Sequence, residues 1–311
     1  MEGHVTVSGV NLWYQVSGEG EPVVQIHGAG FGHFNFAPAT PELARHFRVV
    51  DYDMRGYGQS DRPVQDYDME VWADDLAGLM DALEIEQAHV HGTSMGGMIA
   101  IVFAGKYPER TTSVVINCAA AKLGMAGRLV FKNWIDIARM DPDGPGSRIL
   151  AELIAWQALS KAFLETPDGV AAIDTIQQIL RDSNDLEVFT TACQAMCDMD
   201  IRGWLAKITS PALVLGGDED LMTPWDQGPD GAVFVGVNFR DDAAAARAYL
   251  EEFGVAYASL PDDSGSIAHR FGVPYLPATI VVGADGQLRF RALGAVDEGT
   301  LRDLIARASA A

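Results

Sequence analysis

Short runs of apolar residues alternate with segments of helical periodicity over the first 121 residues. Residues 4–7 and 12–16 alternate between apolar and polar side chains around Ser8-Gly9, which predicts a β-hairpin. Apolar residues recur at helical spacing over 69–84. Buried strands are predicted at 22–26, 48–52, 88–91 and 112–117, and further helices at about 41–45 and 95–106. This alternation predicts an α/β fold with a doubly wound, mostly parallel sheet.

The strand pattern stops between residues 122 and 205. Helices are predicted there at 128–140, 148–163, 168–181 and 185–197, and an apolar strand follows at 211–215. A helical block between two strands of such a sheet predicts a cap over an active site. We therefore expect an α/β core at 1–121 and 206–231, with a helical cap at 122–205.

Composition and charge narrow the class of protein. With 48% hydrophobic and 21% charged residues among 311, the chain has the profile of a soluble globular protein. The net charge of −21 argues against nucleic acid and an anionic membrane surface as partners. No secretory signal and no apolar run long enough to cross a bilayer is visible, so the cytoplasm is the expected compartment. Cys118, Cys193 and Cys197 cannot all pair and are interpreted as free thiols.

The run Gly92-Thr93-Ser94-Met95-Gly96 lies between a predicted strand and a predicted helix. A serine with glycine two positions away on each side suits a strand-to-helix turn that is too tight for side chains at the glycines. Such a turn presents Ser94 Oγ at the carboxyl end of the sheet, and the N–H groups that follow can stabilise an oxyanion. The same five residues also fit a glycine-rich turn with an inactive serine, so the context has to decide.

With these features in order, residues 1 to about 231 resemble an α/β-hydrolase. The resemblance rests on His27-Gly28, the polar loop 53–60, the turn at 92–96, the helical cap, and the segment 216–220 followed by Thr223-Pro224. Within this superfamily, the stretch from residue 117 and the stretch 193–217 are similar to enol-lactone hydrolases of aromatic catabolism. Carbon–carbon bond hydrolases and esterases are close alternatives.

The resemblance implies a role for each site residue. Ser94 would be the nucleophile, and the N–H groups of Met95 and of Ala29, next to Gly28, would form the oxyanion hole. Asp220 would be the acid of the triad. Asp218 is the nearby alternative, but Asp220 has the family spacing to Thr223-Pro224.

A histidine has to take the proton of the serine, and this fold places it after the acid in the chain. Only His269 follows Asp220, in a predicted helix where the family has a strand and a loop with a Gly-His-like pair. We therefore expect His269 to be a solvent-facing helix residue. The remaining candidates do not have the family position and are interpreted as structural: His27, His33, His89 and His91.

Residues 232–311 resemble the latter part of a thioredoxin-like domain of the disulfide-reductase type, with Pro277 at the position of the family's cis-proline. The helix with the family's Trp-Cys-x-x-Cys motif is missing, and no cysteine follows Cys197, so this segment cannot carry out thiol–disulfide exchange. Two incomplete halves meeting at 228–232 indicate a chimera. The alternative is a divergent hydrolase whose C-terminus only looks thioredoxin-like.

The function predicted from the sequence is hydrolysis of a small carboxylic ester or lactone by Ser94, impaired if nothing replaces the family histidine. One alternative is a catalytically inactive chimera that binds a small molecule or a protein. Another is a carbon–carbon bond hydrolase. We expect a small-molecule partner, no nucleic acid, no membrane, no cofactor and no metal.

Overall fold

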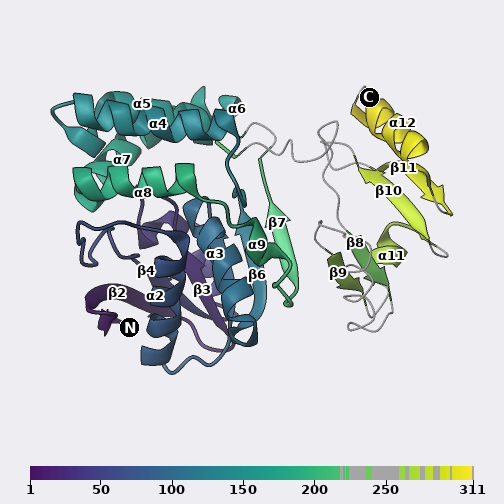
Figure 1. Cartoon of the computed structure of the whole chain (residues 1–311), viewed down its shortest axis with the longest axis horizontal. Helices are drawn as coiled ribbons and strands as arrows, with labels where there is room; N and C mark the ends of the chain where they lie inside the picture. The colour runs from purple at the N-terminus through teal and green to yellow at the C-terminus, as the bar shows by residue number, and fades with distance from the viewer. Residues whose placement is uncertain are drawn as a thin grey trace. The chain divides into compact units, whose positions relative to one another are not determined.

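The computed structural model describes residues 1–217, 220, 222–223, 236–239, 259–262, 266–273, 277–282, 288–294 and 296–309. The chain divides into two compact units, Met1–Pro224 and Trp225–Ala311, and each is described by itself (Figure 1). Asp218 and the predicted junction at 228–232 lie outside the described residues. The predicted domain boundaries therefore stay predictions.

A seven-stranded sheet forms the core of the first unit, in the order β1-β2-β4-β3-β5-β6-β7. β1 and β2 run antiparallel to their neighbours, and the other strands are parallel to one another. This arrangement confirms the predicted α/β class and the mostly parallel sheet. The strands are β1 (Glu2–Val7), β2 (Val10–Ser17), β3 (Pro22–Ile26), β4 (Arg48–Tyr52), β5 (Ala88–Thr93), β6 (Thr111–Asn117) and β7 (Ala212–Leu215).

The hairpin predicted around Ser8-Gly9 is present, because Val7 pairs with Val10 across a two-residue turn. Ser8 and Gly9 both have positive φ, 49° and 81°, as the twist of a tight hairpin requires.

Helix α3 (Met95–Lys106) is deeply buried, since every residue from Met95 to Gly105 is buried. Its small and apolar residues allow it to pack closely on the sheet, as expected from its composition. Helix α2 (Met69–Ala82) packs beside it and begins at Asp68, whose side chain accepts a hydrogen bond from Val71 N–H. The shorter helices of the core are η1 (His33–Phe36), α1 (Thr40–Leu43), η2 (Pro108–Arg110) and α9 (Arg202–Leu205).

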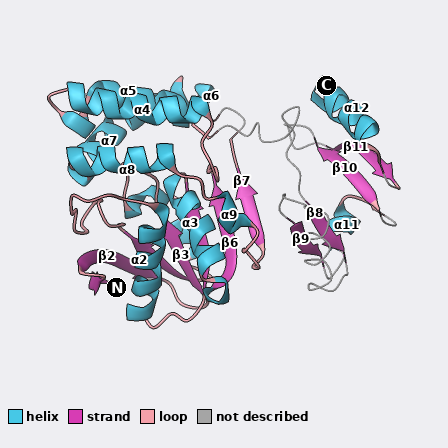
Figure 2. Cartoon of the chain, viewed as in Figure 1, coloured by secondary structure: helices cyan, strands magenta, loops and turns pink. Residues whose placement is uncertain are grey.

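The predicted helical block forms a layer at one end of the strands (Figure 2). Its members are α4 (Met125–Met140), η3 (Gly144–Gly146), α5 (Arg148–Ala158), α6 (Lys161–Leu164), α7 (Pro167–Ser183) and α8 (Leu186–Asp198). The prediction of one helix over 148–163 is wrong. Leu159 is extended, and the Ser160 side chain accepts from Phe163 N–H, so a new helix begins there.

The second unit contains two separate strand pairs among its described residues. β8 (Gly236–Phe239) and β9 (Ser259–Asp262) are parallel, and β10 (Ala278–Val282) and β11 (Leu288–Leu293) are antiparallel. Its helices are α11 (Ser266–Arg270) and α12 (Glu298–Ser309). None of the helices described in either unit is long and apolar enough to span a membrane.

A buried ion pair ties the loop after β4 to helix α2. Arg55 Nη2 lies 2.6 Å from Asp75 Oδ1, and Arg55 Nε donates to Asp75 Oδ2 at 2.8 Å. Trp72 Nε1–H donates to the carbonyl of Arg55 at 2.9 Å. Both charged side chains are more than nine-tenths buried, so each depends on the other for its stability in the interior.

We expect Asp75→Asn to lower the free energy of unfolding by about 3–5 kcal/mol, because it leaves the Arg55 guanidinium buried without a counter-charge. The control is Asp81→Asn. It breaks the ion pair between Arg110 and Asp81, whose own carboxylate is 69% exposed. That loss should stay below about 1 kcal/mol. Urea unfolding followed by tryptophan fluorescence measures both, and equal losses would contradict a buried, mutually dependent pair.

Candidate active site

Ser94 occupies the turn between β5 and α3 in a backbone conformation that few side chains adopt. Its φ is 55° and its ψ is −120°. Its N–H donates to Asn117 O at the end of β6 (2.8 Å), and its carbonyl accepts from Gly97 and Met98 N–H. Non-glycine residues are held in such regions only where their surroundings fix them, often at functional sites. The turn predicted from the sequence is therefore present.

The glycines around Ser94 are required by close contacts between backbones. A Cβ on Gly92 would collide with the carbonyl of Gly96, and a Cβ on Gly96 would collide with the carbonyl of Ile26 at the end of β3. Only glycine fits at these two positions. The spacing seen in the sequence is thus the consequence of a turn packed against the neighbouring strand.

The loop after β3 passes directly beside Ser94. A Cβ added to Gly28 would meet Ser94 Cβ at 3.3 Å. The Gly28 N–H donates to Asn35 Oδ1 at 3.0 Å, so it has a partner already. In the part of the chain that the structure describes, the N–H groups of Ala29 and Met95 donate to no protein acceptor. The structure therefore leaves two backbone donors near Ser94 available for a ligand.

Asp220 lies just beyond β7 and is held by its own turn. Its Oδ1 accepts from Met222 N–H at 2.8 Å and from Thr223 N–H at 3.0 Å, and its Oδ2 accepts from the Thr223 hydroxyl at 2.8 Å. Burial and then the nearby Asp220 carboxylate raise the pKa of the Cys118 thiol. Since Cys118 follows Asn117, the end of β6 links the acid to the Ser94 turn.

The buried histidines of the first unit have structural roles. His27 is fully buried, its Nε2 accepts from Met54 N–H, and its Nδ1 therefore carries the proton and donates to Gly28 O. Burial lowers the pKa of His27 to about 4, so the ring is neutral near pH 7. His33 Nδ1 binds the buried Asp53 carboxylate at 2.9 Å. Both ring nitrogens of His27 and the Nδ1 of His33 therefore have partners within the protein.

His91 belongs to a row of polar side chains across three neighbouring strands. Asp51, Gln25 and His91 are aligned in register on β4, β3 and β5. Gln25 Nε2 donates to His91 Nδ1 at 3.1 Å, and the Thr40 hydroxyl lies 3.1 Å from Asp51 Oδ2. Burial raises the pKa of Asp51 to about 6. Within this row, the Nδ1 of His91 therefore has a hydrogen-bond partner on the neighbouring strand.

Three further histidines contact other residues or solvent. His89 contacts Ser113 and Glu21, His4 contacts Gln59 O, and His269 lies exposed on α11 of the second unit. Among the described residues, no imidazole forms a hydrogen bond with Ser94 or with Asp220. The structure brings together Ser94, Gly28, Ala29 and Met95, and it joins Asp220 to them through β6.

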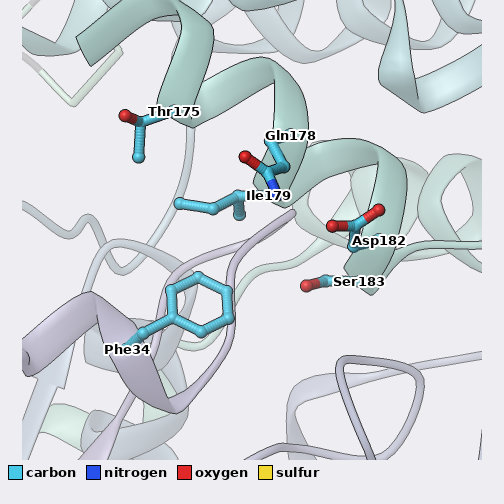
Figure 3. A pocket seen from close by; sticks show the side chains of 6 residues that line it. All are labelled: Phe34, Thr175, Gln178, Ile179, Asp182 and Ser183. Atoms are coloured by element: carbon cyan, nitrogen blue, oxygen red, sulfur yellow. The ribbon is translucent and has the colours of Figure 1, made fainter. Parts of the chain in front are cut away.

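A cavity of about 150 Å³ lies between η1, just after this loop, and cap helix α7. Figure 3 shows Phe34 on the η1 side, facing residues of α7 that include Ile179 and Asp182. A second cavity of about 440 Å³ lies between the N-terminal end of α2 and the C-terminal end of α8. Neither cavity is lined by Ser94 or Asp220.

A family model described as "alpha/beta hydrolase fold" matches residues 21–232. The chain belongs to this family. The family identification confirms the predicted α/β-hydrolase enzyme, of a kind that hydrolyses ester bonds, and the match ends at residue 232, where the segment predicted to be thioredoxin-like begins.

Three proteins to which the chain is similar are named for different hydrolytic activities. The chain is 30% identical to 3-oxoadipate enol-lactonase 1 of Acinetobacter baylyi, over 69% of this chain and 78% of the relative. It is 41% identical to 2-hydroxymuconate semialdehyde hydrolase of a Pseudomonas species, over 37% of this chain and 42% of that hydrolase. The solved structure of an esterase from Thermogutta terrifontis is similar with a TM-score of 0.64 and 25% identity, over 84% of this chain and 90% of the esterase.

Several contacts that shape this hydrolase site were not predicted from the sequence. Asn35, Asn117 and Thr223 hold Gly28, Ser94 and Asp220 respectively. Only Thr223 has a local signal, because a threonine three residues after an aspartate can bind its carboxylate within one turn. Asn35 and Asn117 act through folding contacts that no local pattern shows.

We expect Gly96→Ala to destabilise the first unit by about 3 kcal/mol and to displace Ser94, because the added methyl group meets the Ile26 carbonyl. Gly203→Ala is the matched control, since a Cβ at Gly203 in α9 has open space around it. Thermal unfolding measures both variants. Equal stability of the two would show that the turn accommodates a side chain at 96.

Because the pKa of Asp51 is raised, we expect Asp51→Asn to increase the free energy of unfolding by an amount that depends on pH. The pKa is raised from 3.8 to about 6 in the folded state, so the unfolded chain ionises first as the pH increases. The wild type therefore loses stability between pH 3.8 and 6, by about 3 kcal/mol relative to a neutral side chain. In urea unfolding, the free energy of unfolding of Asp51→Asn should equal that of the wild type below pH 4 and exceed it above pH 6. A constant difference across this range would contradict a raised pKa.

Proposed function

We propose that the protein is a serine hydrolase of small carboxylic esters or lactones, with Ser94 as the nucleophile. The observation that carries the proposal is the strained Ser94 turn beside two unoccupied backbone N–H groups, those of Ala29 and Met95. A serine oxygen that attacks an ester carbonyl creates a negative oxygen, and paired N–H donors stabilise that charge. Asp220 is the proposed acid, fixed by Met222 and Thr223.

In the proposed reaction, Ser94 Oγ bonds to the carbonyl carbon and its proton leaves. The tetrahedral oxyanion lies against the Ala29 and Met95 N–H groups, and the alcohol or enol departs with a proton. Water then hydrolyses the acyl-enzyme and regenerates Ser94. Because the described histidines of the first unit have other roles, the proton of Ser94 passes to solvent or to a base from outside this set.

We expect slow hydrolysis of p-nitrophenyl butyrate that depends on Ser94 and is accelerated by added imidazole. An unassisted serine hydroxyl is a poor nucleophile near neutral pH, and added imidazole can take its proton as a general base. Ser94→Ala should abolish both the basal and the imidazole-stimulated rates, and His269→Ala should leave both unchanged. Steady-state kinetics with and without imidazole measure these rates.

Two results would change this proposal. Hydrolysis that survives Ser94→Ala would remove Ser94 from the mechanism. Loss of activity in His269→Ala to the level of Ser94→Ala would identify His269 as the base. A circular dichroism spectrum of each variant provides the control for folding.

Within this chemistry we propose an enol-lactone as the substrate class, supported by the relative that aligns over 78% of its own length. The alternative is cleavage of a carbon–carbon bond, supported by higher identity over a shorter stretch, 41% over 120 residues. Comparing kcat/KM for 3-oxoadipate enol-lactone and for 2-hydroxymuconate semialdehyde separates the two.

For the second unit we propose a thioredoxin-like segment without its redox helix, joined to the hydrolase as a chimera. Support comes from the antiparallel pair β10–β11 followed by α12, together with the absence of cysteine after Cys197. We also propose a cytoplasmic location. The three cysteines are all free, as is usual in a reducing compartment.

A further inference from the structure

Two histidines fasten the ends of the loop that carries Gly28 and Ala29. At the start of the loop, His27 Nε2 accepts from Met54 N–H at 3.0 Å. At its end, His33 donates to Asp53 Oδ1 twice, from its backbone N–H at 2.7 Å and from Nδ1 at 2.9 Å. The loop is thus attached at both ends to two adjacent residues that follow β4.

The Asp53 carboxylate is surrounded closely by backbone groups of two loops. Its carboxylate is inaccessible to solvent and also accepts from Gln59 N–H at 2.8 Å. A Cβ on Gly32 would lie 2.7 Å from Asp53 Oδ1, and a Cβ on Gly58 would collide with the same carboxylate. Burial acts to raise the pKa of Asp53, but the hydrogen bonds from His33 and the backbone lower it overall. Asp53 is therefore a buried anion, and its attraction for the donors of His33 is strong.

The ring of His33 is also held by packing. Its centroid lies 4.1 Å from the Trp13 ring and 5.2 Å from the Phe34 ring. Trp13 is on β2 and Asp53 follows β4, whereas Ser94 follows β5 on the other side of β3. His33 is therefore directed away from Ser94, and its influence on the reaction has to pass through the loop.

We propose that His33 is a positioning residue for the oxyanion hole. Its bond to Asp53 fixes the end of the loop 27–33, and this keeps the Ala29 N–H directed at the oxygen that becomes charged on the substrate. The inference rests on the proposed function of Ser94. It assigns His33 a role in the rate of the chemical step, with no role in proton transfer.

The experiment separates the hydrogen bond of His33 from its ring. His33→Asn keeps an N–H donor at the position of Nδ1 and removes the ring, and His33→Phe keeps a ring against Trp13 and removes the donor. His46→Phe, at an exposed histidine of the same unit, is the matched control. If His33→Phe does not fold, His33→Gln replaces it, because the longer side chain moves its amide away from Asp53.

Two measurements are made on each variant. For p-nitrophenyl butyrate hydrolysis, we expect His33→Phe to lower kcat about 10-fold with little change in KM, less than the 10²–10³-fold lost when an oxyanion donor is removed outright. His33→Asn and His46→Phe should stay close to the wild type. Hydrogen–deuterium exchange read by mass spectrometry should be faster in peptides covering 27–36 of His33→Phe alone.

Each remaining result has a defined meaning. A His33→Phe variant that matches His46→Phe in both kcat and exchange overturns the proposal. A His33→Asn variant whose kcat falls as much as that of His33→Phe also overturns the proposal, because the ring and not the hydrogen bond would then determine the rate. If the wild type shows no turnover that depends on Ser94, the proposed function fails, and the exchange rates alone decide whether His33 holds the loop.

Discussion

The contact between the Ser94 turn and the end of β3 is the constraint on which the site depends. The Cα of Gly96 lies so close to the Ile26 carbonyl that no side chain fits between them. This contact places the loop 27–32 beside Ser94 and brings the Ala29 and Met95 N–H groups to the same end of the sheet. Backbone strain at Ser94, of order 1–3 kcal/mol, is offset by the burial of α3 on the sheet.

The sequence predicted those parts of the fold that depend on local pattern. The hairpin at Ser8-Gly9, the strands of the core and the helical cap follow from alternation, periodicity and turn residues, and the structure contains them. The error at 148–163 has a local cause as well. Leu159 continues the apolar spacing of a helix, but the Ser160 hydroxyl that follows it caps a new helix in place of continuing the old one.

Contacts between distant residues were beyond such reasoning. Asn184 Nδ2 donates to Gly30 O across 154 residues, and His33 meets Asp53 across 20. Neither pair can be recognised from its spacing in the sequence, because the sheet order β4-β3-β5 determines which loops become neighbours. For the same reason the hydrogen-bond partners of the histidines emerged only from the fold. Most of them hold loops or strands together.

Among the described residues, hydrogen bonds other than those of an imidazole hold Asp220. Asp220 has two oxygens with about four acceptor positions, and backbone and hydroxyl donors of Met222 and Thr223 fill three of them. The remaining neighbour is the Cys118 thiol, which is a weak donor. The Asp220 carboxylate is therefore stable in its present surroundings. An imidazole N–H would displace only its weakest contact, the one with the Cys118 thiol. The Ser94 turn, the loop with Gly28 and the Asp220 carboxylate each have hydrogen bonds of their own, so each keeps its position without an imidazole bonded to Ser94.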